Sequence, residues 1–143
     1  MIRAAFVLAG LGLGLTAVTA QSNPIAERQQ TMKGVGAATR EGAAMAKGDA
    51  AFDAAKAQAI FKTYADAARK MPGLFPDSSK TGGETTAAAK IWEDQAGFKA
   101  AFAKFESDAA AGASVANLDG FRGAFGAATK NCGACHEVYR IKK

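Results

Sequence analysis

Two cysteines and the only histidine of the chain stand close together near its C-terminus, in the sequence Cys132-Gly133-Ala134-Cys135-His136. On a helix, residues three and four apart share one face, so Cys132 and Cys135 present their thiols one turn apart. Each thiol can add to one vinyl group of a haem, and the neutral imidazole of His136 can bind the iron from the proximal side. Gly133 and Ala134 are small and let the macrocycle approach the backbone. The pentapeptide therefore indicates one covalently attached haem c.

Other uses of this pentapeptide fit the sequence less well. A structural zinc site needs four ligands, whereas the chain has two cysteines and one histidine. A thioredoxin-like redox pair would follow a strand at the start of a helix, and the sequence contains no convincing strand. A plain disulfide would leave His136 without a role.

The N-terminal 20 residues have the features of a cleaved export signal. Arg3 provides a positive charge, residues 4–15 form an apolar run broken by glycines, and residues 18–20 form a small-residue cleavage site. The apolar run is too short for a comfortable membrane span, so we expect no membrane anchor after cleavage, with a retained anchor as the alternative. Because c-type haem is attached outside the cytoplasm in bacteria, we expect a periplasmic haem domain over residues 21–143.

The charge of the chain limits its partners. The formal net charge is +5, and loss of Arg3 with the signal leaves +4. The sequence has no long basic run and little aromatic interleaving, so we expect no nucleic-acid partner. An acidic redox partner protein is favoured by the basic residues around the haem motif, although a solvated cluster is the simpler interpretation of Lys130, Arg140, Lys142 and Lys143.

Composition and periodicity predict an all-α fold. Alanine is frequent, β-branched residues are few, and prolines mark segment ends. We expect four helices, which run from Asn23-Pro24 to about Lys47, from Asp53 to about Lys70, over roughly Ile91 to Ala111, and from near Asn117 to about Arg140. The long connection between the second and third helices predicts a crossover loop, with Leu74 and Phe75 tucked onto the bundle.

Apolar residues at spacings of three and four predict which helix faces form the core. The predicted stripe of the second helix consists of Ala57, Ile60, Phe61, Tyr64, Ala67 and Ala68. The stripe of the last helix runs from Leu118 through Phe121, Phe125 and Ala128 to Cys132 and Cys135. Since the cysteines continue this stripe, we expect an antiparallel four-helix bundle with the haem between its helices.

The group on the other side of the iron decides the function, and the residues leave it open. A second histidine ligand from the same chain is excluded, because His136 is the only histidine. Methionine is the usual alternative, and the candidates that remain after signal cleavage are Met32, Met45 and Met71. Met32 lies in the middle of the first predicted helix, on the face that carries Arg28 and Val35, and filling the core is the commoner role of a buried methionine. An empty sixth position under an apolar side chain is a further alternative.

Two arginines lie at helical spacing from the candidate ligands. Arg28 precedes Met32 by four residues, so its guanidinium can reach a haem propionate from the same face. The alternative for Arg28 is a solvated surface charge beside Glu27. Arg140 follows His136 by four residues and can lie beside the proximal face or a propionate. We predict that both arginines help to bind the haem.

These features together resemble class II c-type cytochromes, the family that comprises cytochrome c′ and cytochrome c-556. The similarity covers essentially the whole chain after the signal. The haem motif is shared by all c-type cytochromes, but its position at the C-terminal end together with Arg-x-x-x-Met at the start is far more specific. The matching segments are residues 28–32, 52–55, 74–76, 91–94 with Phe98, and 132–140.

The resemblance implies a left-handed four-helix bundle with His136 as proximal ligand and position 32 on the distal side. In cytochromes c′ the distal side chain does not bind, and the iron is five-coordinate. In cytochromes c-556 a methionine of the first helix binds and gives six-coordinate, low-spin haem. Residues 28–33, followed by glycines, look more like the second group. Family members often dimerise through the first two helices, and the sequence leaves monomer and homodimer open.

We therefore expect a periplasmic electron carrier, and not an enzyme, with His136 and Met32 as axial ligands. The redox chemistry belongs to the haem, and the protein supplies ligands, burial and charge. The alternative is a five-coordinate cytochrome c′ that binds nitric oxide or carbon monoxide at an open distal site. Peroxidase-type catalysis is not expected, because no distal histidine is left to handle protons.

Overall fold

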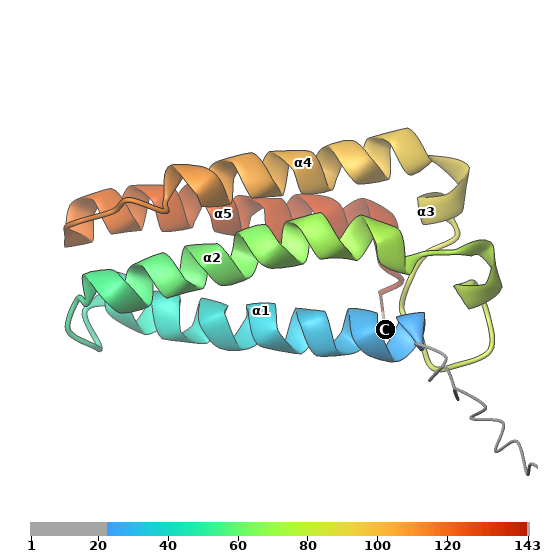
Figure 1. The fold of residues 1–143 in the computed structure, drawn as a ribbon, viewed down its shortest axis with the longest axis horizontal. Helices are drawn as coiled ribbons and strands as arrows, with labels where there is room; N and C mark the ends of the chain where they lie inside the picture. The colour runs from blue at the N-terminus through green and yellow to red at the C-terminus, as the bar shows by residue number, and fades with distance from the viewer. Residues whose placement is uncertain (1–22, 143) are drawn as a thin grey trace, which may run out of the picture.

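The computed structural model describes residues 23–142, and the predicted signal lies outside them. The chain folds into an antiparallel, up-and-down bundle of four long helices (Figure 1), which are α1 (Pro24–Lys47), α2 (Ala54–Lys70), α4 (Gln95–Ala111) and α5 (Leu118–Tyr139). α1 and α4 each pack against both α2 and α5. The predicted all-α four-helix bundle is confirmed. Within the described residues, no helix is both long and apolar enough to cross a membrane.

Capping residues explain where the long helices begin and end. The side chains of Asn23, Asp53 and Asn117 accept hydrogen bonds from the first free backbone N–H groups of α1, α2 and α5. Pro24 occupies the first turn of α1, where its missing N–H costs nothing. Gly48 ends α1 with a left-handed φ of 87°, a conformation that glycine adopts without steric cost. These helix boundaries are those predicted from the sequence.

The predicted third helix is wrong in one respect, because it is broken at Asp94. The chain forms a short helix, α3 (Lys90–Glu93), and α4 then begins at Gln95. Asp94 has a φ of −133° and a ψ of 63°, and its carboxylate accepts a 3.0 Å hydrogen bond from the backbone N–H of Gly97. An aspartate that caps the helix after it competes with continuation of the helix before it. The chain therefore bends at this residue.

The crossover between α2 and α3 covers the end of the bundle at which the C-terminus lies (Figure 1). It contains two short 3-10 turns, η1 (Met71–Leu74) and η2 (Asp77–Ser79). The ring of Phe75 packs edge-on against the ring of Phe98, with centroids 4.8 Å apart. The backbone carbonyl of Phe75 accepts a 3.0 Å hydrogen bond from the Trp92 indole. The predicted packing of Leu74 and Phe75 against the bundle is confirmed.

An aromatic cluster fills the core toward the other end of the bundle. Phe61, Tyr64 and Phe121 are completely buried, and the ring of Phe61 lies 6.2 Å from Tyr64 and 5.9 Å from Phe121. The Tyr64 hydroxyl shares a 2.8 Å hydrogen bond with Thr39, and burial raises the pKa of Tyr64 to about 12. The predicted stripes of α2 and α5 are thus core-facing, with the two cysteines half-buried at the far end of the second stripe.

Candidate haem site

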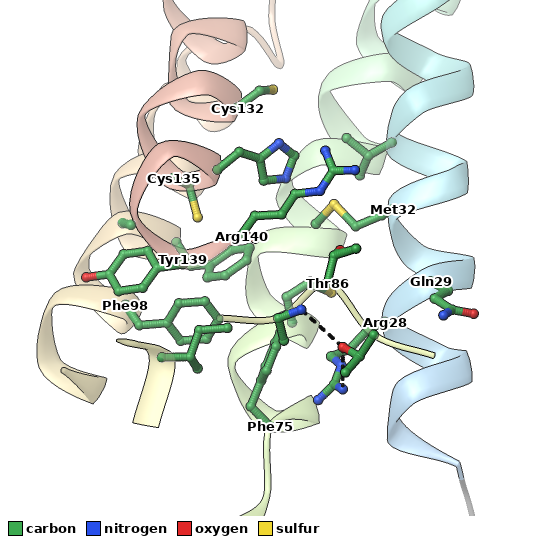
Figure 2. A pocket seen from close by; sticks show the side chains of 18 of the residues that line it. Arg28, Gln29, Met32, Phe75, Thr86, Phe98, Cys132, Cys135, Tyr139 and Arg140 are labelled. Carbon is green, nitrogen blue, oxygen red and sulfur yellow. Dashed lines mark hydrogen bonds between the residues drawn. The ribbon is translucent and has the colours of Figure 1, made fainter. Parts of the chain in front are cut away.

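A cavity of about 250 Å³ lies between α1, α4, α5 and the crossover (Figure 2). α5 brings two thiols and an imidazole to it, and α1 brings a thioether and a guanidinium. Much of the remaining wall is apolar and includes Ile25, Val35, Phe75, Ile91, Phe98, Phe102 and Phe105. The fold gathers every predicted site residue around this one space, namely Arg28, Met32, Cys132, Cys135, His136 and Arg140.

The two cysteines have the arrangement that covalent attachment requires. Both are free and half-buried, and they lie one turn apart on the face of α5 that lines the cavity. Burial raises the pKa of both thiols, and the neighbouring Cys132 adds to the shift at Cys135, so both are protonated at neutral pH. A Cβ at Gly133 would meet nothing within 4 Å, so the linker between the thiols is open on its outer side. Two free thiols beside an imidazole at an apolar cavity fit a c-type haem.

His136 is suited to bind iron at neutral pH. His136 is exposed as a whole residue, and it forms part of the cavity lining. This partial burial, followed by the charge of Arg140, lowers the pKa of His136 below its usual value of 6.5. The imidazole is therefore neutral at pH 7, and the lone pair that a metal ion requires is free.

The three candidate methionines occupy different surroundings. Met45 is 1% exposed in the core and does not line the cavity, so it acts as a core filler. Met71 lines the cavity but is 4% exposed and forms part of η1. Met32 is half-buried, and Figure 2 shows its thioether pointing from α1 into the cavity, across from the helix that carries Cys132 and Cys135. Met32 is thus the methionine best placed for a distal role.

Arg28 is buried, so the alternative interpretation as a solvated surface charge is wrong. It is 5% exposed, and burial lowers the pKa of its guanidinium. Nη1 donates to the carbonyl of Leu74 at 3.0 Å and to Ser79 Oγ at 2.9 Å, and Nη2 donates to the carbonyl of Ser79 at 3.2 Å. Within residues 23–142, Arg28 forms no ion pair with a carboxylate. Its contact with a propionate stays a prediction.

Arg140 lies at the boundary between α5 and the crossover. Its backbone forms an isolated antiparallel bridge with Ala87. Figure 2 shows its side chain extending across the cavity from α5 toward Met32. The predicted position of Arg140 beside the candidate ligands is consistent with this placement, and its role toward a haem stays a prediction.

Sequence reasoning missed the contribution of Tyr139 and of the crossover residues that precede α3. Tyr139 lines the cavity, is 9% exposed, and donates a 3.1 Å hydrogen bond to Asp94 Oδ2. Its carbonyl accepts from Ala88 N at 3.0 Å, and Ile141 N donates to the carbonyl of Thr86 at 2.8 Å. A signal for Tyr139 was present, because it follows His136 by three residues on the same helix. No comparable signal marked residues 86–88.

The last helix of this four-helix bundle presents the sequence Cys-x-x-Cys-His to a largely apolar cavity. This combination defines a c-type haem protein with a four-helix bundle fold. The family model described as Cytochrome C′ matches residues 23–140. The chain therefore belongs to the cytochrome c′ family, and it carries covalently bound haem c.

Relatives with two different names resemble this chain. It is 41% identical over 143 residues to a cytochrome c′ of Rhodopseudomonas palustris, covering 99% of this chain and 98% of that protein. It is 38% identical over 123 residues to a cytochrome c-556 of Agrobacterium fabrum, covering 83% of this chain and 82% of that protein. A solved structure of cytochrome c′ from Rhodopseudomonas palustris superposes with a TM-score of 0.81 at 43% identity, covering 86% of this chain and 99% of that one. Proteins of this family are bacterial, periplasmic haem proteins that carry electrons or bind small gases.

Proposed function

We propose that this protein is a periplasmic monohaem electron carrier, and not an enzyme, in which His136 and Met32 bind the iron from opposite sides. The position of Met32 carries the proposal. Its thioether comes from α1 into the cavity that α5 lines with Cys132, Cys135 and His136. When bound, the haem supplies one-electron redox chemistry at a potential that its axial ligands tune.

The residues of the chain have separable tasks in this proposal. Cys132 and Cys135 hold the cofactor covalently, and His136 offers a neutral nitrogen. Met32 offers a soft sulfur from a different helix, so the two ligands are fixed by the packing of α1 against α5. Much of the wall around the space between them is apolar. His136 and Met32 would stay in place in both oxidation states of a bound haem, and this would favour outer-sphere electron transfer.

Arg28 supports the binding of a haem, which both candidate functions share, through its charge. A guanidinium stays ionised even when burial lowers its pKa, and a buried cation without an anionic partner is costly. Arg28 borders the cavity and has hydrogen-bond partners that are all uncharged. A propionate group of the cofactor is an anion that this position can compensate.

An acidic redox protein is the partner that the exposed charges favour. Lys130, Arg140 and Lys142 are all exposed, and within the described part of the chain none of the three forms a salt bridge. A positive surface beside the haem helix accelerates encounter with a negative partner, and salt screens that attraction. Electron exchange with an acidic partner should therefore slow as ionic strength rises.

Gas binding at a five-coordinate iron is the second candidate, and two observations favour it. The relative matched over 99% of this chain is named a cytochrome c′. Met32 also packs partly against the hydrophobic core, as a side chain that only covers the distal side would do. In this alternative the apolar wall around Met32 would receive nitric oxide or carbon monoxide.

Absorption spectra of the ferric and ferrous holoprotein, with and without carbon monoxide, test the proposal. Sharp low-spin ferrous bands that resist carbon monoxide support the electron carrier, whereas broad high-spin bands with ready carbon monoxide binding support the gas binder. Met32→Ala should convert the low-spin spectrum to a high-spin one. Met71→Ala, which alters the other methionine of the cavity, is the matched control and should leave the bands unchanged. A low-spin spectrum that survives in Met32→Ala would refute ligation by Met32.

A further inference from the structure

The candidate iron ligand lies at the end of its helix, where helices open most easily. His136 belongs to the last turn of α5, which ends at Tyr139. The final carbonyls of a helix have no intrahelical partners, and terminal turns exchange with open forms at low cost. α5 also lacks a glycine cap, since Arg140 follows in an extended conformation with a φ of −124° and a ψ of 134°. The orientation of His136 therefore depends on contacts outside α5.

Tyr139 makes those contacts with two other segments. Its hydroxyl donates to Asp94 Oδ2 at 3.1 Å, and its carbonyl accepts from the N–H of Ala88 at 3.0 Å. Its ring packs edge-on against Phe98, with centroids 5.2 Å apart. The hydroxyl, the ring and the carbonyl of Tyr139 thus each connect the last turn of α5 to residues at or just before the start of α4.

Asp94 is itself fixed in the geometry that receives the hydroxyl. Its Oδ1 accepts from Gly97 N at 3.0 Å, and this bond, followed by that from Tyr139, lowers the pKa of the carboxyl group. The acceptor is therefore a carboxylate at neutral pH. A Cβ at position 97 would lie 2.6 Å from the Tyr139 hydroxyl and 2.9 Å from Asp94 Cγ. Only glycine leaves room for the pair.

We propose that the hydrogen bond from Tyr139 to Asp94, with Gly97 packed beneath it, is a positioning device that fixes the orientation of His136. Tyr139 is a positioning residue here, since it acts on the iron through the histidine three residues before it. The inference rests on His136 as proximal ligand, and it holds for an electron carrier and a gas binder alike. The same residue, Asp94, thus caps α4 and accepts the hydrogen bond from the last turn of α5.

Tyr139→Phe in the holoprotein tests this device, because it removes the hydroxyl and keeps the ring. Hydrogen exchange at the backbone amides of residues 136–139 should accelerate about tenfold or more, since a hydrogen bond to a charged group has been lost. The reduction potential should rise. Ferric iron depends more than ferrous iron on donation from the imidazole, so a loosened histidine disfavours the oxidised state more.

Tyr64→Phe is the matched control, because it removes the hydroxyl of the other buried tyrosine, whose partner is Thr39. Tyr64 does not line the cavity, so this variant should lower stability without moving the potential. Equal potentials in the two variants, or exchange that accelerates evenly along the whole of α5, would overturn the proposal. These outcomes do not depend on the result for Met32→Ala, because that variant tests only whether Met32 binds the iron.

Gly97→Ala provides a second route to the same bond without altering either partner. The added methyl should displace the pair, so the potential should shift in the same direction as in Tyr139→Phe. The double variant, Tyr139→Phe with Gly97→Ala, should shift the reduction potential no further than the larger of the two single changes, because both substitutions remove the same hydrogen bond. Gly123→Ala on α5, where a Cβ meets nothing within 4 Å, controls for the glycine-to-alanine change. Fully additive shifts in the double variant would contradict the shared mechanism.

Discussion

Replacement of Arg28 by methionine would show how strongly α1 holds the crossover that closes the haem end of the bundle. Arg28 makes three hydrogen bonds of 2.9–3.2 Å to Leu74 and Ser79, and its guanidinium carbon lies 4.4 Å from the centroid of the Phe75 ring. A fourth contact, to Thr85 Oγ1 at 3.5 Å, is too long to contribute much. Methionine keeps the length and the apolar stem of the side chain but removes every donor.

The size of the effect follows from these contacts. Loss of a hydrogen bond to a charged group costs about 1.5–3 kcal/mol, and a cation–π contact adds about 0.5–1 kcal/mol. These values overlap, because the contacts share one side chain, and removal of a buried charge recovers part of the loss. We expect Arg28→Met to lower the free energy of unfolding by about 2–4 kcal/mol. Arg28→Lys should lose most of the same amount, since one ammonium cannot reproduce the planar fork.

Denaturant titration of the holoprotein, followed by circular dichroism, measures this loss. Limited proteolysis between residues 79 and 85 should accelerate in parallel, because the crossover is released before the bundle unfolds. Arg40→Met removes the same charge from an exposed position on the same helix, and it should change the free energy of unfolding by no more than about 0.5 kcal/mol. If Arg28→Met and Arg40→Met were equally stable, Arg28 would not hold the crossover.

Two further predictions concern the aromatic end of the bundle. Gly42→Ala should destabilise the protein by about 1–2 kcal/mol in the same titration, because a Cβ there would collide with the Phe125 ring and overpacking outweighs the better helix propensity of alanine. Gly34→Ala on the same helix, with open space around it, should stabilise the protein by about 0.5–1 kcal/mol. If Gly42→Ala and Gly34→Ala changed the free energy of unfolding equally, the close contact between position 42 and the Phe125 ring would be contradicted. Above pH 10 the free energy of unfolding should fall as the pH approaches about 12, because the unfolded phenol ionises near 10 while the pKa of Tyr64 is raised to about 12. Subtraction of the pH profile of Tyr64→Phe isolates this contribution, and identical profiles would contradict it.

The parts of the fold that could be predicted from sequence are those that depend on local physics. Helix starts at Asn23 and Asp53 follow from capping chemistry, and the core stripes follow from the helical period. The attachment site could be predicted because Cys132, Cys135 and His136 lie within five residues. Their placement on one helix face required only the expectation of a helix.

Features that depend on partners far along the chain could not be predicted in the same way. The break at Asp94 is stabilised by Tyr139, which lies 45 residues away, and neither residue indicates the other in sequence. Arg28 could be read as a surface charge because its acceptors at Leu74 and Ser79 are 46 and 51 residues distant. In each case a polar group meets its partner only after the helices have packed. The spacing of residues along the chain therefore does not predict the hydrogen bond.

The separation between the aromatic cluster and the cavity has a consequence for how this fold diverges. Phe61, Tyr64, Phe121 and Phe125 make up much of the buried aromatic core, and none of them lines the cavity. An exchange at position 32 therefore changes the cavity wall and the partial core contacts of Met32, whereas these four rings keep their contacts with one another. The chain is for the same reason a suitable template for redesign, because a histidine can be introduced at position 32 as a candidate ligand while the four rings keep these contacts.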